Sequence, residues 1–150
     1  MGLTVVKGLR SEIFVPVTPA PVWTPVTKEL KDMSVALASA AGIHTMEQER
    51  FNLAGDFTWR KIENTVPTGG LMVSHGGYDN SDVNKDINCM FPLDRIHELA
   101  KAGFIRACAP VHAGFMGGGG NQEKFKNVTG PQIARMFKSE DVDAVILTAG

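Results

Sequence analysis

The stretch Val142–Gly150, VDAVILTAG, decides the fold that the sequence predicts. It is a short apolar run with branched side chains that passes into small residues, which is typical of a buried parallel strand. In open α/β sheets, ligands and reacting groups gather just beyond the carboxyl ends of such strands. A parallel strand needs cover on both faces. We therefore expect the front part of an enzyme, with its reactive residue following Gly150.

Working outward from that strand, apolar runs and helical patterns alternate. We expect strands over 33–40, 71–74 and 104–111, a helix from Pro92 that ends at Gly103, and a helix over 129–138. The polar stretch between the second strand and the first helix predicts a long surface loop. This order of elements predicts an α/β fold with a mainly parallel sheet and flanking helices, of the Rossmann or flavodoxin kind, incomplete at the carboxyl terminus.

Residues 1–32 are predicted to form an extended proline-rich arm, and residues 33–150 the α/β domain. Four prolines fall between Phe14 and Leu30, and proline both fixes φ and removes a backbone donor. The arm also carries several large apolar residues. We favour a strap over the chain's own core, and the alternative is a surface for a partner subunit.

Composition excludes several classes of protein. A net charge of −1 argues against nucleic-acid binding, and no apolar run is long enough for a membrane span. The first residues lack a signal-peptide pattern, so we expect a cytoplasmic location. Cys89 and Cys108 have no redox or metal spacing, and no His/Cys set has zinc spacing, so no metal site is predicted.

The stretch His75–Asp79, HGGYD, has the strongest character of a site. A histidine at a strand tip can exchange protons near neutral pH, and paired glycines let a backbone approach a ligand closely. His112 is predicted to hold the equivalent place on the later strand, and His44 to follow the first strand. The alternative is a turn whose polar groups satisfy the backbone. The candidate substrate- or partner-binding residues are Gly76, Gly77, Tyr78, Asp79, Gly117 and Gly118.

The glycine run Gly117–Gly120 could cradle an anion with its backbone N–H groups. It lacks the spacing of a dinucleotide-binding or Walker motif, and a flexible loop is the alternative. A small phosphate-binding protein is thus a further possibility that rests on this run alone. Cys89 precedes the first helix and could be a reactive thiol, although a small buried side chain is the favoured interpretation.

Five long strings carry a resemblance to a known family. They are SEIFVPVTPAPVWTPVTKELKDM (11–33), RFNLAGDF (50–57), VSHGGYDNSDVNKDINCMFPLD (73–94), APVHAGFMGGGGNQ (109–122) and VDAVILTAG (142–150). Over Leu3–Gly150 the sequence resembles the selenoprotein subunits of the glycine, sarcosine, betaine and D-proline reductase family. The WTPVTK and GFMGGGGNQ strings resemble the D-proline branch.

The resemblance implies an oxidoreductase of amino-acid fermentation that opens the ring of D-proline to 5-aminopentanoate. In the family the last strand runs into a selenocysteine, whose UGA codon also reads as a stop. A selenolate attacks the substrate, a pyruvoyl group on a partner subunit captures the amine, and a dithiol is the electron donor. No cofactor is expected in this chain itself.

Without a residue after Gly150 to act as nucleophile, the 150-residue chain is expected to be inactive. We predict His75 or His112 as the proton donor of the reaction. Two alternatives remain open: a sarcosine, betaine or glycine reductase subunit of the same family, and a non-catalytic module that binds another subunit.

Overall fold

The computed structural model describes residues 24–117 and 121–149. Most of the predicted arm therefore lies outside the described residues. The elements in chain order are η2 (Leu30–Asp32), β1 (Ser34–Ser39), β2 (Ile43–Thr45), β3 (Trp59–Glu63), η3 (Thr68–Gly70), β4 (Leu71–Val73), η4 (Ile87–Cys89), α1 (Leu93–Lys101), β5 (Ala107–Cys108), β6 (Val111–Phe115), α2 (Gln122–Lys124), the π-helical turn η5 (Phe125–Thr129), α3 (Gly130–Ser139) and β7 (Ala144–Thr148).

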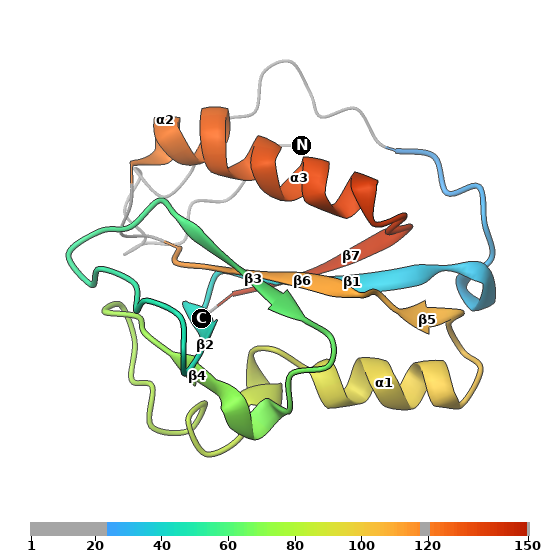
Figure 1. The fold of residues 1–150 in the computed structure, drawn as a ribbon, viewed down its shortest axis with the longest axis horizontal. Helices are drawn as coiled ribbons and strands as arrows, with labels where there is room; N and C mark the ends of the chain where they lie inside the picture. The colour runs from blue at the N-terminus through green and yellow to red at the C-terminus, as the bar shows by residue number, and fades with distance from the viewer. Residues whose placement is uncertain (1–23, 118–120, 150) are drawn as a thin grey trace, which may run out of the picture.

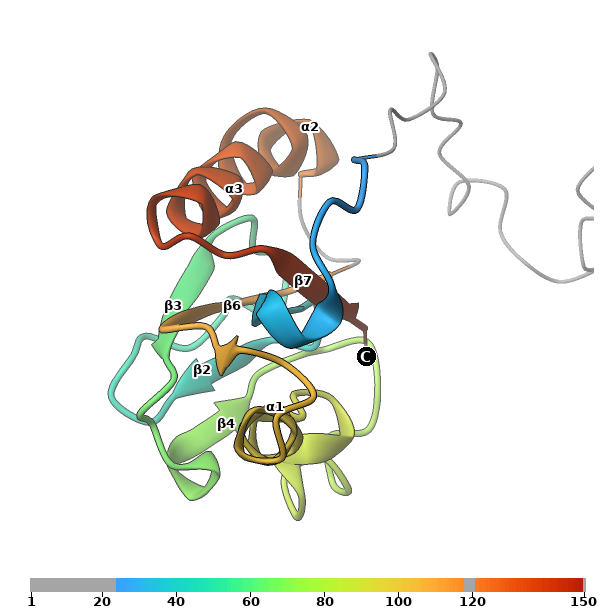
Figure 2. The ribbon, with the colours of Figure 1, turned by 90° about the vertical axis from the view of Figure 1, so that its right-hand side faces the viewer.

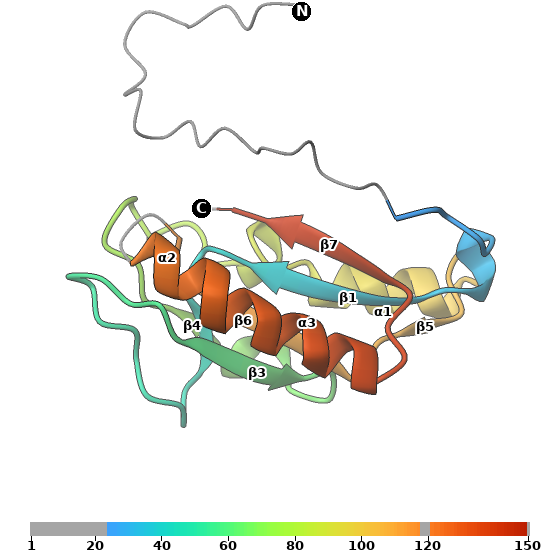
Figure 3. The same ribbon diagram turned by 90° about the horizontal axis from the view of Figure 1, so that it is seen from above.

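The main sheet is organised around β1. On one side β1 pairs in parallel with β5 and β6, and on the other it pairs in parallel with β7. β3 closes the far side by antiparallel pairing with β6. β2 and β4 form a separate antiparallel pair. Figures 1 and 3 show this mixed sheet lying between the helices. The α/β prediction is confirmed, and the parallel sheet is confirmed only in part.

The two long helices cover opposite faces of the sheet (Figures 1 and 2). β1 supplies both cores, because successive side chains of a strand point to opposite faces. Val35 and Leu37 belong to the core that includes residues of α1, whereas Ala36 and Ala38 belong to the core that includes residues of α3. All six residues of β1 are buried. The small alanines leave room for α3 to pack closely.

The predicted strand over 104–111 is wrong in its bounds. The chain instead forms the short strand β5, breaks at Pro110, and resumes as β6. Proline cannot donate to a ladder, and the Pro110 carbonyl accepts a bond from the Asn64 backbone outside the sheet. The first helix begins and ends within a residue or two of its predicted bounds, and Gly103 follows it with φ of +77°.

β7 is a strand as predicted, but it is not buried. Val145 is 38% exposed, Ile146 42% and Leu147 76%. The reason is its position: within the part of the chain that the structure describes, β7 pairs with β1 alone and α3 covers it only partly. An apolar groove of about 300 Å³ lies between α3 and this strand. We call it the β7 groove. It is lined by Ala38, Phe115, Phe125, Gly130, Ile133, Ala134, Phe137, Val145 and Leu147.

Candidate functional site

The ends of four strands meet at one edge of the molecule, which we call the carboxyl edge. It consists of residues 40–42 after β1, residues 74–78 after β4, and residues 115–117 at the end of β6. Backbone bonds join them: the Gly117 N–H donates to the Ala40 carbonyl at 2.9 Å, and the Gly42 N–H to the Phe115 carbonyl at 2.8 Å. The Ala40 N–H reaches the Thr148 carbonyl at 2.9 Å, so β7 ends here too. The predicted convergence of these loops is confirmed.

The carboxyl edge requires a glycine where β1 turns. Gly42 has φ of +76°, which disfavours residues with a side chain. A Cβ at this position would lie 2.2 Å from the Ser74 carbonyl oxygen. The Ser74 N–H also donates to the Gly42 carbonyl at 2.9 Å. The loops after β1 and β4 therefore approach each other more closely than any other residue would allow.

His75 lies at this edge with both ring nitrogens engaged. Its Nε2 is 2.9 Å from the Gly117 carbonyl oxygen, and its Nδ1 accepts from the Gly77 N–H at 2.9 Å. The ring packs 4.9 Å from that of Tyr78, centroid to centroid. Because a carbonyl only accepts and an amide N–H only donates, Nε2 carries the proton of a neutral ring. His75 thus bridges the loops after β4 and β6.

The other predicted residues of this loop divide into two groups. Tyr78 is half-buried, its hydroxyl donates to the Ala41 carbonyl at 3.0 Å, and burial raises its pKa. Gly76, Gly77 and Asp79 are exposed. The Asp79 carboxylate accepts from the Ser81 backbone, which lowers its pKa. Gly118, the last predicted binding residue, lies outside the described residues.

The predicted position of His112 is wrong. It is not beyond a strand end but within β6, fully buried and opposite Ile62 of β3. Its Nδ1 accepts from the Leu37 N–H at 2.9 Å, and its Nε2 lies 3.4 Å from the Cys108 sulfur. Burial lowers the pKa of His112 to about 4. The sequence misled because Pro110 suggested a strand end, whereas it marks the break between β5 and β6.

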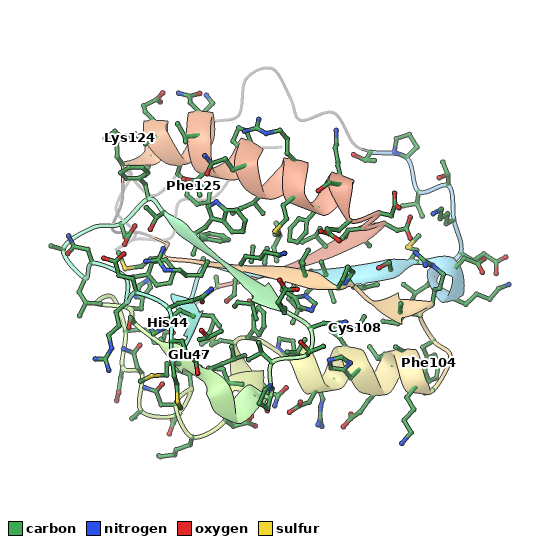
Figure 4. The ribbon with its side chains drawn as sticks, viewed as in Figure 1. His44, Glu47, Phe104, Cys108, Lys124 and Phe125 are labelled. Carbon is green, nitrogen blue, oxygen red and sulfur yellow. The ribbon has the colours of Figure 1, made fainter. Side chains whose placement is uncertain are left out.

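His44 is also a bridging residue. It lies in β2, is 1% exposed, and its Nδ1 donates to the Thr45 carbonyl at 2.7 Å (Figure 4). Its Nε2 accepts from the Ser74 hydroxyl at 2.8 Å. His97 bonds the Asn64 carbonyl at 3.0 Å from the exposed side of α1. All four imidazoles therefore connect one part of the chain to another.

Sequence analysis missed one set of contacts at the carboxyl edge. The hydroxyls of Ser39 and Thr148, at the ends of β1 and β7, both donate to the Met90 carbonyl, at 3.2 and 2.6 Å. These bonds hold the segment before α1 against two strand ends. The only signal in the sequence is a hydroxyl residue at the end of each strand. Cys89, next in the chain, is exposed.

The remaining chemistry is limited. Cys108 is buried, and burial raises its pKa to about 11, so it is a neutral thiol near pH 7 (Figure 4). Among residues 24–117 and 121–149, no three His, Cys, Asp or Glu side chains lie together as a metal site would require. No helix in the described part of the chain is long and apolar enough to cross a bilayer.

Residues 7–150 match the family described as glycine/sarcosine/betaine reductase selenoprotein B. The chain belongs to this family. It is 68% identical, over 148 residues, to the D-proline reductase subunit gamma of Acetoanaerobium sticklandii. That alignment covers 99% of this chain and 61% of the relative. No solved structure matches the chain.

Two further relatives are more distant. The glycine reductase complex component B subunit gamma of Carboxydothermus hydrogenoformans is 26% identical, and the sarcosine reductase complex component B subunit beta of Peptoclostridium acidaminophilum is 27% identical. Each alignment covers 96% of this chain and 35% of the relative. The chain therefore spans about three fifths of the D-proline reductase subunit and about a third of the other two. The resemblance inferred from the sequence strings is confirmed.

Proposed function

We propose that this chain is the amino-terminal part of a D-proline reductase subunit. The observation that carries the proposal is the difference in identity: 68% to the D-proline reductase subunit gamma against 26 and 27% to the glycine and sarcosine reductase relatives. The proposed reaction is reductive ring opening of D-proline to 5-aminopentanoate, with a dithiol as electron donor. The predicted cytoplasmic location stays a prediction.

The chemistry that the proposal needs comes from outside the 150 residues: a selenolate beyond Gly150 would attack the substrate, while a pyruvoyl group on a partner subunit would hold its amine. The contribution of this chain is position. β7 ends at the carboxyl edge, where the Thr148 carbonyl accepts from Ala40 and the Thr148 hydroxyl donates to Met90. A residue that follows β7 would thus begin from a fixed point beside His75 and Gly117.

The proton donor was predicted to be His75 or His112, and this role stays a prediction. Each ring already uses its Nε2 proton within the fold, on the Gly117 carbonyl or towards the Cys108 sulfur. His112 is also buried away from the carboxyl edge and is neutral near pH 7. His75 is the better placed of the two, but it would have to release Gly117 in order to protonate a substrate.

The test is a substrate panel with the purified complex that contains the full-length subunit. We expect dithiol-dependent formation of 5-aminopentanoate from D-proline, followed by mass spectrometry, and no turnover of sarcosine, betaine or glycine. The 150-residue chain alone should be inactive in the same assay. Turnover of sarcosine or glycine in place of D-proline would assign the subunit to another branch of the family.

A second candidate function, a non-catalytic module that binds another subunit, is favoured by the β7 groove. Its lining is almost entirely apolar, and Leu147 at its rim is 76% exposed, which is typical of a surface that something covers. The two candidates differ in one result. A binding module would join the complex while its removal left D-proline turnover unchanged, whereas removal of a catalytic subunit would abolish turnover.

A further inference from the structure

We infer that His75 is a positioning residue that fixes the start of the glycine run, and that it is not the group that protonates the substrate. This inference rests on the proposed function for its catalytic consequence only. It begins from the two ring nitrogens of His75, both of which are occupied within the fold. Nδ1 accepts from the Gly77 N–H, and Nε2–H donates to the Gly117 carbonyl, each at 2.9 Å.

Gly117 is held from two directions. Its N–H donates to the Ala40 carbonyl at the end of β1, and its carbonyl accepts from His75. A Cβ at Gly117 would lie 3.1 Å from the Ala40 Cβ, which is a tight contact. Gly117 is therefore clamped between the loop after β1 and the imidazole, and the glycine run leaves the sheet from this clamped residue.

His75 is itself supported on three sides. The Tyr78 ring packs against the imidazole, and the Tyr78 hydroxyl is fixed by the Ala41 carbonyl. The Asn80 side-chain amide donates to the His75 carbonyl at 2.9 Å. A Cβ at Gly77 would lie 2.7 Å from the His75 ring, so glycine is needed for the turn to close over the imidazole. Side chains held by such supporting contacts can fix a neighbouring group precisely.

The consequence concerns the predicted binding residues. Gly117 and Gly118 were predicted to bind substrate or partner through backbone groups, and backbone groups bind well only when their position is fixed. In our inference His75 supplies that fixed position through Gly117. Loss of the Nε2 donor would leave the Gly117 carbonyl without this partner and would loosen the start of the run.

The experiment compares two amide replacements of His75 in the complex that contains the full-length subunit. In His75→Gln the amide N–H can reach the position of Nε2 and donate to Gly117. In His75→Asn the shorter amide can replace Nδ1 only. Neither amide can act as an acid near pH 7. His97→Gln is the matched control, because His97 makes a similar single bond to the Asn64 carbonyl on an exposed helix.

Two quantities are measured: hydrogen exchange of the Gly117 amide by mass spectrometry, and the kcat and KM for D-proline across pH. We expect His75→Asn to speed exchange and to lower kcat/KM, each by roughly tenfold, as loss of one hydrogen bond predicts. His75→Gln should stay within about threefold of wild type in both, with an unchanged pH profile. His97→Gln should change neither quantity.

The inference is overturned if His75→Gln loses as much turnover as His75→Asn while Gly117 exchange stays at the wild-type rate, because His75 would then act as the acid. It is equally overturned if neither variant alters exchange. The exchange measurement needs no substrate. A wild-type complex that fails to convert D-proline would therefore refute the proposed function and leave the test of His75 intact.

Discussion

The carboxyl edge and the β7 edge are built from similar sequences and have opposite surroundings. β1, SVALAS, is buried at every residue, whereas AVILT of β7 is more apolar and is exposed through its centre. β1 has a strand on each side and a helix over each face. β7 has one neighbour, β1, among the described residues. Burial in this molecule is thus decided by place in the sheet and not by the apolar character of the strand.

The two regions also differ in how their polar groups are treated. At the carboxyl edge, imidazoles and backbone amides bond across loops that are far apart in sequence, such as His75 to Gly117. The β7 groove offers almost no polar group at all. A preformed edge of the first kind suits a small ligand, and an apolar surface of the second kind suits a further stretch of protein.

The sharpest way to break the carboxyl edge is Gly42→Ala. The new methyl group would meet the Ser74 carbonyl oxygen at 2.2 Å, and the residue would be held at φ of +76°. We expect the free energy of unfolding to fall by roughly 4 kcal/mol or more, since both backbone strain and a steric clash contribute. The measurement is urea unfolding of the full-length subunit.

The control for that variant is Gly69→Ala, in the short helix η3. No atom lies within 4 Å of a Cβ added there. Its stability should change by about 1 kcal/mol or less, in either direction. Equal losses in the two variants would mean that the contact between the loops after β1 and β4 is not what stabilises this edge.

A pair of truncations sharpens the comparison between the two regions. Phe91 is fully buried in the core that includes α1, and Phe91→Ala should cost about 3–5 kcal/mol of stability. Leu147→Ala should cost about 0.5 kcal/mol or less in the 150-residue chain, because the side chain is 76% exposed. If a further stretch of protein covers the β7 groove, Leu147→Ala should cost more in the assembled complex than in the isolated chain. An equal, small cost in both would argue that the groove stays open.

The sequence predicted the elements of this fold better than their surroundings. The apolar runs at β1 and β7, the helix after Pro92, and the turn at Gly103 are local signals, and each was found near its predicted place. The break at Pro110 was misread because a proline can end a strand or interrupt two short ones. Only the pairing of the Pro110 carbonyl with Asn64, a long-range contact, separates the two cases.

The candidate site shows the same division. A strand followed by His75 and two glycines indicated a loop at the carboxyl edge, and the structure places it there. The sequence could not show that the His75 ring is fully occupied, because its partner Gly117 is 42 residues away. His112 looked equivalent to His75 in the sequence, but the register of β6 against β3 buries it.

The buried ring of His112 makes stability depend on pH. Its pKa is lowered to about 4 in the folded chain from an ordinary value of 6.5. Between these values the unfolded chain binds a proton that the folded chain does not, so stability falls as pH falls from 6.5 to about 4 and the contribution is constant below that. The predicted loss is on the order of 3 kcal/mol, measured by urea unfolding across this range.

His112→Asn is the control for this pH dependence. Its side-chain oxygen can still accept from the Leu37 N–H, and an amide does not titrate. The variant should start from a lower stability at pH 7 and should lack the part of the decrease between pH 6.5 and 4 that His112 causes. A decrease of the same size in wild type and variant would assign the effect to other groups.

The smallest expected effect lies at the start of β7, where Asp143 joins three partners. Its carboxylate accepts from the Ser34 N–H at 2.8 Å and from Arg106 at 3.2 Å, and it also bonds Lys28. The Lys28 ammonium and the Ser34 amide are the main causes that lower the pKa of Asp143 to about 2. Because the folded pKa is lowered, this stabilisation is complete above the ordinary value near 4 and is lost as pH falls towards 2.

Asp143→Asn should therefore lower the melting temperature slightly at pH 7, and the gap from wild type should narrow as pH falls from 4 to 2. Thermal unfolding of both proteins at matched pH checks this. The same bonds anchor the segment before η2 at the amino end of β7, so the variant also tests what holds that end of an otherwise exposed strand. A gap that stays constant down to pH 2 would mean that the charge of Asp143 contributes nothing, and that its hydrogen bonds, which an amide can partly retain, do not depend on ionisation.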